Sequence, residues 1–315
     1  FAVMHALKDK GVAIVYISHR MEEVFAHCDT ITVMRDGYAI SSKPTRETNM
    51  EQVVRDMVGR SITEYYPGRT NEPGEIVLEV KNFCQEGLFN NISFKLRKGE
   101  ILGVAGLMGA GRTEIMRALF GVDSCKHGEV YLHGKKVCIK KPEDAIKAGI
   151  GFITENRKSE GLILDFSISR NIALPSVDTF AKRSVINAKN ETAFSEALSK
   201  KLGVKTASID LEAGALSGGN QQKVVIAKWI GMNPSIIIMD EPTRGIDVGA
   251  KRDIYDLMNE LTSQGVAIIM VSSELPEVIG MSDRILVIHE GKIAGELDHE
   301  EATQEKIITL ATGGQ

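Results

Sequence analysis

The chain has 315 residues, of which 43% are hydrophobic and 25% charged, with a formal net charge of −4 and a pI near 6.0. These values are typical of a globular protein with a substantial core, and the acidic balance argues against a nucleic-acid-binding protein. The four cysteines lie far apart and form no CxxC pair, which indicates reduced thiols in a cytosolic protein. No apolar run approaches the roughly 20 residues that cross a bilayer.

An internal repeat relates the two ends of the chain. Residues 11–14 (GVAI) match residues 265–268 (GVAI), and the same offset of 254 residues places Asp29 over Asp283. The register holds without a gap through the N-terminal segment, which chance identity would not produce.

The repeat predicts the domain organisation. We expect residues 1–60 to be the C-terminal part of a first domain, residues 61–75 to be a turn-rich linker and residues 76–315 to be a complete second domain. Because the chain starts at Phe1 within a helical pattern, we interpret it as a fragment of a parent chain of about 500 residues.

Early in the second domain, alternating residues predict strands at 76–80 and 92–96, and an apolar strand at 101–105 leads into a glycine-rich loop and a helix. Strand, glycine-rich loop and helix form the context of a phosphate-binding P-loop, in which backbone amides and the positive end of the helix face the phosphates. The predicted nucleotide-binding residues are Gly106, Gly109, Ala110, Gly111, Arg112, Thr113 and Glu114.

Two positions of this loop have specific consequences. The Thr113 hydroxyl is a predicted Mg²⁺ ligand. Arg112 stands where the motif has Lys, and its planar guanidinium keeps the charge but is a poor substitute for the compact ammonium between the β- and γ-phosphates.

A second glycine-rich segment precedes a helix predicted at 222–230. A hydroxyl and free amides at a helix N-terminus form an anion site, although a serine there can also be a simple N-cap. The candidate residues are Leu216, Ser217, Gly218, Gly219, Asn220 and Gln221.

An apolar strand predicted at 236–239 then delivers two adjacent acids. In phosphoryl transfer this arrangement directs the first acid to the metal and the second to the attacking water. We therefore predict that Asp240 binds Mg²⁺ and that Glu241 is catalytic.

These three motifs in this order resemble the ABC ATPase superfamily. The resemblance implies an α/β fold of the P-loop NTPase class, with a RecA-like core, an antiparallel β subdomain and a helical subdomain at about 160–230, plus the C-terminal part of a second copy. It also implies that the 216–221 segment is the signature that completes a partner domain's ATP site, that Glu155 stands in the Q-loop where Gln is usual, and that Asp247 lies in the D-loop.

The resemblance gives the two copies different roles. His19 follows an apolar strand predicted at 12–17 and is similar to the family's switch histidine, whereas its counterpart in the second copy is Ser273. A serine does not replace the imidazole as a charge-tunable contact. We therefore expect His19 to be catalytic, and the site of Arg112 and Ser273 to bind nucleotide with little or no turnover.

The longer motifs ENRKSEGL, LSGGNQQK, DEPTRGIDVGAK and VSSELPEV closely resemble the fused ATP-binding subunits of bacterial simple-sugar importers. Within that group the resemblance favours ribose, with the galactose/methyl-galactoside importers as the alternative. It implies ATP and Mg²⁺ as cofactors, two membrane permease subunits, an extracytoplasmic sugar-binding protein, possible dimerisation of the ATPase subunit, and a location on the cytoplasmic face of the bacterial membrane.

Two other interpretations are a soluble tandem ABC ATPase of translation or DNA repair, and an isolated half without activity. The short linker and acidic charge disfavour the first, and the second describes this polypeptide taken alone. Phe83 and Phe89 are candidates to stack on adenine, although core packing is favoured for both of them and for Trp229.

Overall fold

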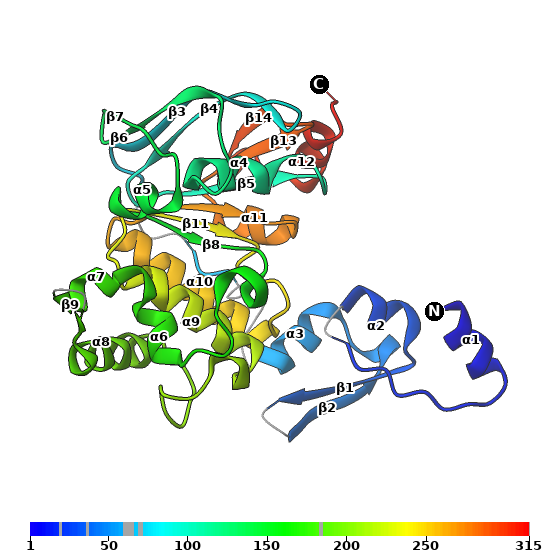
Figure 1. Cartoon of the computed structure of the whole chain (residues 1–315). Helices are drawn as coiled ribbons and strands as arrows, with labels where there is room; N and C mark the ends of the chain where they lie inside the picture. Colours follow the sequence, from blue (N-terminus) through cyan, green and yellow to red (C-terminus); the bar gives the residue numbers. More distant parts are fainter. Residues whose placement is uncertain (19–20, 36–37, 59–65, 69–71, 183–184, 315) are drawn as a thin grey trace. The chain divides into compact units, whose positions relative to one another are not determined.

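The computed structural model describes residues 1–18, 21–35, 38–58, 66–68, 72–182 and 185–314 (Figure 1). The chain divides into two units. One comprises residues 1–66 with 247–253, and the other comprises residues 67–246 with 254–315.

A six-stranded sheet forms the centre of the larger unit, with strand order β14-β13-β5-β12-β11-β8. All neighbours in this sheet are parallel except the β13–β14 pair, which is antiparallel. Every residue of β8, β11 and β12 is buried, as expected of apolar strands covered on both faces. The strands are β5 (Ile101–Gly106), β8 (Ile150–Ile153), β11 (Ile236–Asp240), β12 (Ala267–Val271), β13 (Arg284–His289) and β14 (Lys292–Asp298).

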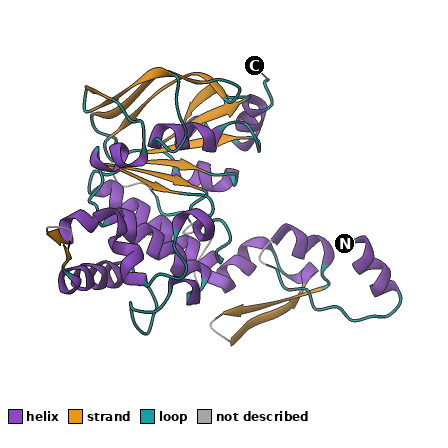
Figure 2. Ribbon diagram, viewed as in Figure 1, coloured by secondary structure: helices purple, strands orange, loops and turns teal. Residues whose placement is uncertain are grey.

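Helices pack against this sheet (Figure 2). Helix α4 (Arg112–Phe120) contacts β5, β8 and β11, and α5 (Pro142–Lys147) contacts β8. Helices α11 (Leu275–Met281) and α12 (Gln304–Ala311) contact β5 and bury the apolar cluster around Val278 and Ile307. Helix α10 spans Val248–Ser263 and the short helix η6 spans His299–Glu301.

A four-stranded antiparallel sheet, with order β4-β3-β6-β7, accompanies the central sheet in the same unit. The strands predicted at 76–80 and 92–96 are confirmed, and the observed strands are longer, since the first continues to residue 85 and the second spans residues 89–97. The strands are β3 (Ile76–Gln85), β4 (Phe89–Arg97), β6 (His127–Leu132) and β7 (Lys135–Val137).

The helical part of this unit lies between β8 and β11 in the sequence. Helix α6 packs against α8 and α9, and α9 reaches back to β8, so the signature segment is tied to the central sheet. The elements are a π-helical turn (Arg157–Gly161), α6 (Ile168–Ala173), η4 (Leu174–Ser176), α7 (Val177–Phe180), β9 (Ala181–Lys182), β10 (Val185–Ile186), α8 (Ala188–Lys201), η5 (Ala213–Ala215) and α9 (Gly218–Ile230). The RecA-like core, antiparallel subdomain and helical subdomain expected from the sequence are thus confirmed.

The smaller unit consists of α1 (Ala2–Asp9), α2 (Met21–His27), β1 (Thr30–Arg35), β2 (Tyr38–Pro44), η1 (Thr45–Glu47) and α3 (Met50–Val58). Its core contains Val24, Ile31, Val33 and Val53. The strand predicted at 12–17 is wrong: these residues are irregular, and Ile17 is 92% exposed. No strand among the described residues pairs with this segment, and a strand without a neighbour has no partners for its backbone groups.

The internal repeat is confirmed at the level of secondary structure. At the offset of 254 residues, the bounds of α2, β1, β2 and η1 fall on those of α11, β13, β14 and η6 without any shift, and α3 starts where α12 starts. The sequence pattern therefore encodes the same local structure twice. No helix in the described part of the chain combines the length and the apolar character needed to cross a membrane.

Candidate nucleotide site

The loop after β5 has the backbone of a phosphate-binding loop. Gly106, Gly109 and Gly111 all have positive φ, at 154°, 79° and 99°, and Gly111 immediately precedes α4. A β carbon at Gly106 would lie 2.4 Å from the carbonyl oxygen of Ile288, so only glycine fits there. The predicted succession of strand, glycine-rich loop and helix is confirmed, with the N-terminus of a nine-residue helix facing the loop.

Backbone hydrogen bonds from two hairpins hold this loop in place. The amide of Gly291, between β13 and β14, donates to the carbonyl oxygen of Ala110 at 2.8 Å. The carbonyl oxygen of Gly291 accepts from the amide of Asn90 in β4, also at 2.8 Å. The loop is therefore fixed by the fold before any ligand arrives.

Arg112 turns back toward the edge of the sheet. Its Nη1 donates to the carbonyl oxygen of Ser272 at 2.8 Å, and its Nη2 lies 3.8 Å from a carboxylate oxygen of Glu241. The side chains of Arg112 and Glu241 are only 11% and 10% exposed. The guanidinium at the predicted position of the phosphate-binding Lys is thus already engaged by groups of the protein.

Asp240, the last residue of β11, is fully buried. Burial raises its pKa to about 6, while the nearby Thr113 hydroxyl and the Arg112 charge act to lower it and the charge of Glu114 raises it further. Among the described residues, neither of its carboxylate oxygens has a hydrogen bond of ordinary geometry. A buried carboxylate in this state beside a hydroxyl matches the hard oxygen donors that Mg²⁺ prefers, so Asp240 and Thr113 fit the predicted metal site.

Glu241 follows β11 with a φ of 49°, an unusual conformation for a residue with a side chain. Its amide donates to the carbonyl oxygen of Val271 at 2.9 Å, and its carboxylate accepts from the hydroxyl of Ser273 at 3.1 Å. Burial raises its pKa to about 7, against the lowering effects of Arg112 and Ser273. The structure therefore brings together the predicted general base, the P-loop arginine and the serine at the switch position.

Glu277 is part of this site and was not predicted from the sequence. Its carboxylate, 1% exposed, accepts hydrogen bonds from the hydroxyls of Thr243 (2.7 Å) and Ser272. It thereby joins the turn after β11 to the end of β12, the two segments that carry Glu241 and Ser273. The sequence does not indicate this role, because the partners of Glu277 lie on other segments of the chain and are known only from the packing.

The signature segment begins α9. Ser217 is exposed at the N-cap position, but its side chain caps no backbone amide and instead accepts from the Asn220 side chain at 3.0 Å. Gln221 is buried and donates to the carbonyl oxygen of Ala213 at 3.2 Å. Ser217 therefore lies at the N-cap position without capping the helix through its side chain. Helix α9 begins at Gly218, four residues before the predicted start at residue 222.

The remaining predicted residues lie on the loops after β8 and β11. Glu155 forms an ion pair with Arg244, and the amide of Ala250 donates to the Asp247 carboxylate at 2.9 Å at the start of α10. His19 lies outside the described residues.

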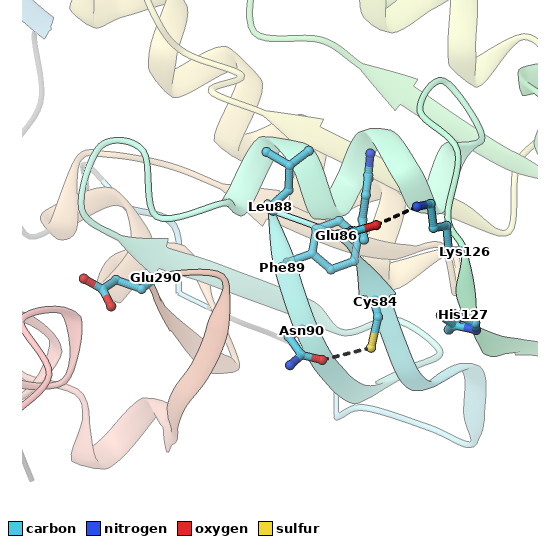
Figure 3. Close-up of a pocket in the computed structure, with 10 residues that line it drawn as sticks. Cys84, Glu86, Leu88, Phe89, Asn90, Lys126, His127 and Glu290 are labelled. Carbon is cyan, nitrogen blue, oxygen red and sulfur yellow. Dashed lines mark hydrogen bonds and ion pairs between the residues drawn. The ribbon is translucent and has the colours of Figure 1, made fainter.

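A cavity of about 540 Å³ lies beside the P-loop (Figure 3). The carbonyl oxygen of Leu88, which lines it, is 3.4 Å from where a β carbon of Gly111 would lie. Two of the residues that line it, Lys126 and Glu86, form an ion pair at 2.6 Å (Figure 3). Phe83 and Phe89 are buried and stack on each other with ring centroids 5.5 Å apart, and Trp229 is also buried, so core packing is confirmed for all three.

Comparisons with known proteins agree with this geometry. Residues 89–244 match the ABC transporter family model. The chain is 61% identical over 315 residues to the "Ribose import ATP-binding protein RbsA" of Bacillus licheniformis, and 62% identical over 315 residues to the protein of the same name in Bacillus subtilis. Each match covers 100% of this chain and 64% of the relative, so the chain spans less than two thirds of the length of these relatives.

Solved structures with the same fold are more distant in sequence. An ATP-binding cassette of an ABC transporter in its ADP conformation is 22% identical with a TM-score of 0.64, over 76% of this chain and 99% of that one. A nucleotide-free cassette is 21% identical with a TM-score of 0.63, over 76% of this chain and 96% of that one. Both show that this chain has the fold of these cassettes.

Proposed function

We propose that this chain, whose residues 89–244 match the ABC transporter family model, is the C-terminal part of the ATP-binding subunit of a ribose importer. The identity of 61–62% to ribose import ATP-binding proteins along the whole chain supports this assignment. In this proposal residues 1–60 end a first nucleotide-binding domain, residues 61–75 are the linker, and residues 76–315 are the second domain.

The second domain binds ATP at its P-loop. The amides of the loop and of the first turn of α4 would bind the phosphates, and Thr113 and Asp240 would hold Mg²⁺. When bound, the metal neutralises phosphate charge. The adenosine part occupies the cavity beside the loop, where the base lies against the half-exposed Leu88, because Phe83 and Phe89 are stacked on each other.

This second site retains nucleotide without efficient hydrolysis. The observation that carries this proposal is the engagement of Arg112 with the carbonyl oxygen of Ser272 and with Glu241. An attacking water needs a free carboxylate to orient it and a switch side chain that reaches the γ-phosphate. Here Glu241 is held by Arg112 and by Ser273, whose short hydroxyl donates to that carboxylate.

Hydrolysis takes place at a composite site. In a head-to-tail arrangement of two domains, the nucleotide of the first domain is completed by the signature of the second, namely Ser217, Gly218 and Gly219 with their neighbours Leu216, Asn220 and Gln221. His19 belongs to that site as its switch residue. The exposed Ser217 hydroxyl and the amides at the start of α9 supply donors for the γ-phosphate.

The subunit works with other proteins in this proposal. Two permease subunits span the membrane, a sugar-binding protein delivers ribose from outside, and the ATP-binding subunit lies on the cytoplasmic face and can dimerise. The names of the relatives support ribose as the sugar.

Binding and transport test different parts of the proposal. Equilibrium binding of a fluorescent ATP analogue to this chain should require Mg²⁺ and should weaken in Asp240→Asn, with Asp298→Asn, an exposed strand-end acid, as the matched control. Equal affinity in all three proteins would refute the nucleotide site. The complete subunit should restore growth on ribose to a bacterium lacking its own ribose ATP-binding subunit, and restoration on galactose alone would refute the sugar assignment.

A further inference from the structure

The loop after β8 contains a π-helical turn, Arg157–Gly161. The Asn156 carboxamide oxygen accepts from the amides of Lys158 and Ser159 at 3.2 and 3.3 Å and so caps the turn. Such turns are rare and occur mostly at functional sites. No predicted residue lies within it, and its contacts reach the three segments that build nucleotide sites.

Arg157 bonds to the turn that follows the acidic pair. Its Nη1 donates to the carbonyl oxygen of Arg244 at 2.7 Å, and its Nη2 donates to the carbonyl oxygen of Gly245 at 3.0 Å. Glu155 adds an ion pair with the Arg244 side chain. One guanidinium therefore fixes two successive carbonyl groups, which a single-point cation does not do.

The same guanidinium lies against the signature. A β carbon at Gly218 would be 2.8 Å from Nη2 of Arg157 and 3.3 Å from the carbonyl oxygen of Gly245. A cation at the positive end of a helix is unfavourable, and burial lowers the pKa of Arg157. Its Nε, moreover, has no hydrogen-bond partner among the described residues. Arg157 thus occupies this position despite its unfavourable charge at the helix N-terminus and despite an Nε that has no partner in the described part of the chain.

Two further contacts continue the connection. The buried Lys228 of α9 donates to the carbonyl oxygen of Gly161 at 2.8 Å. Arg117 of α4, the helix that follows the P-loop, lies 3.7 Å from the carboxylate of Glu160. A five-residue turn thus contacts the signature helix, the P-loop helix and the turn after β11.

We propose that Arg157 is a positioning residue for the composite ATP site: its guanidinium sets the start of the signature helix against the Arg244–Gly245 turn. This inference rests on the proposed function, because the signature acts on a nucleotide held by the first domain. Arg157 itself touches no nucleotide. It acts through Gly218 and Gly245, so its loss misplaces signature donors that meet the γ-phosphate in the transition state.

The test uses the complete subunit with Arg157→Ala, Arg157→Lys and the matched control Arg170→Ala, which removes an exposed arginine of α6. Misplacing a catalytic group by about 1 Å can cost about 100-fold in rate, so kcat of Arg157→Ala should fall by about 10- to 100-fold. KM for ATP and the unfolding midpoint of Arg157→Ala should equal those of Arg170→Ala, because ground-state binding is unchanged. Arg157→Lys should be intermediate, since it restores one of two carbonyl bonds.

Four outcomes would contradict the account. A kcat of Arg157→Ala equal to that of the control overturns the inference, and so does a joint change of kcat, KM and unfolding midpoint. If Arg157→Ala does not fold, a wild-type kcat in a folded Arg157→Lys overturns it instead. A wild-type subunit without ATPase activity refutes the proposed function, and the inference falls with it.

Discussion

Replacing Glu241 by Gln changes the stability of this chain in a way that depends on pH. Folding raises the pKa of this carboxyl from 4.5 to about 7, because burial penalises the charged form more than Arg112 and Ser273 stabilise it. Between these two pH values the native state binds more protons than the unfolded state, so stability falls as the pH rises and then stays low. Gln keeps the shape and an oxygen that accepts from Ser273, but it carries no charge.

The size of the effect follows from the same pKa values. At about 1.4 kcal/mol per pKa unit, the shift from 4.5 to about 7 means that the buried charge lowers the free energy of unfolding by at most about 3.5 kcal/mol above pH 7. This penalty is already net of the attraction of Arg112, because the pKa of about 7 includes it. Glu241→Gln removes the penalty, so we expect a gain of about 3 kcal/mol at pH 8. Below pH 4.5 the carboxyl is protonated in both the native and the unfolded state, so the gain should disappear.

Urea unfolding at pH 5 and pH 8 measures the difference directly. The matched control is Glu300→Gln, which neutralises an exposed acid and should change stability by less than about 0.5 kcal/mol at either pH. A Glu241→Gln variant whose stability differs from wild type by the same amount at both pH values would refute the reasoning.

Other substitutions test neighbouring contacts. Gly218→Ala should lower the free energy of unfolding by about 1–3 kcal/mol, because its β carbon meets atoms at 2.8 and 3.3 Å, whereas Gly68→Ala, with nothing within 4 Å, should be neutral in the same urea assay. Glu277→Ala should cost about 2–4 kcal/mol by leaving two buried hydroxyls without their acceptor, and Glu300→Ala should not, so equal midpoints would count against the bridge. Arg112→Lys should tighten ATP-analogue binding to this chain several-fold, because it frees the loop from the carbonyl of Ser272, and unchanged affinity would contradict that contact.

The sequence was most informative where periodicity and motif coincide. The P-loop lies between a largely buried strand and a helix, and the acidic pair lies at the end of a fully buried strand, so the local structure of both follows from short-range patterns. The exact repetition of α2, β1 and β2 in α11, β13 and β14 has the same origin, because matching residues encode matching elements. The roles of the site residues stay predictions that the experiments above address.

The sequence was least informative where contacts join distant segments. Residues 12–17 carry an apolar pattern that forms no strand here, since strand formation depends on neighbours that the pattern does not contain. Glu277 and Arg157 look like ordinary charged residues until their partners, at separations of 34 and 87 residues, are known. Long-range hydrogen bonds of this kind have no local signature.

The most direct test of the central claim, that hydrolysis belongs to the composite site and not to the site of Arg112 and Ser273, compares two variants of the complete subunit. ATP turnover should fall by at least about 100-fold in His19→Ala, which removes the proposed switch residue, and by less than about threefold in Glu241→Gln. A loss in Glu241→Gln as large as that in His19→Ala would contradict the account.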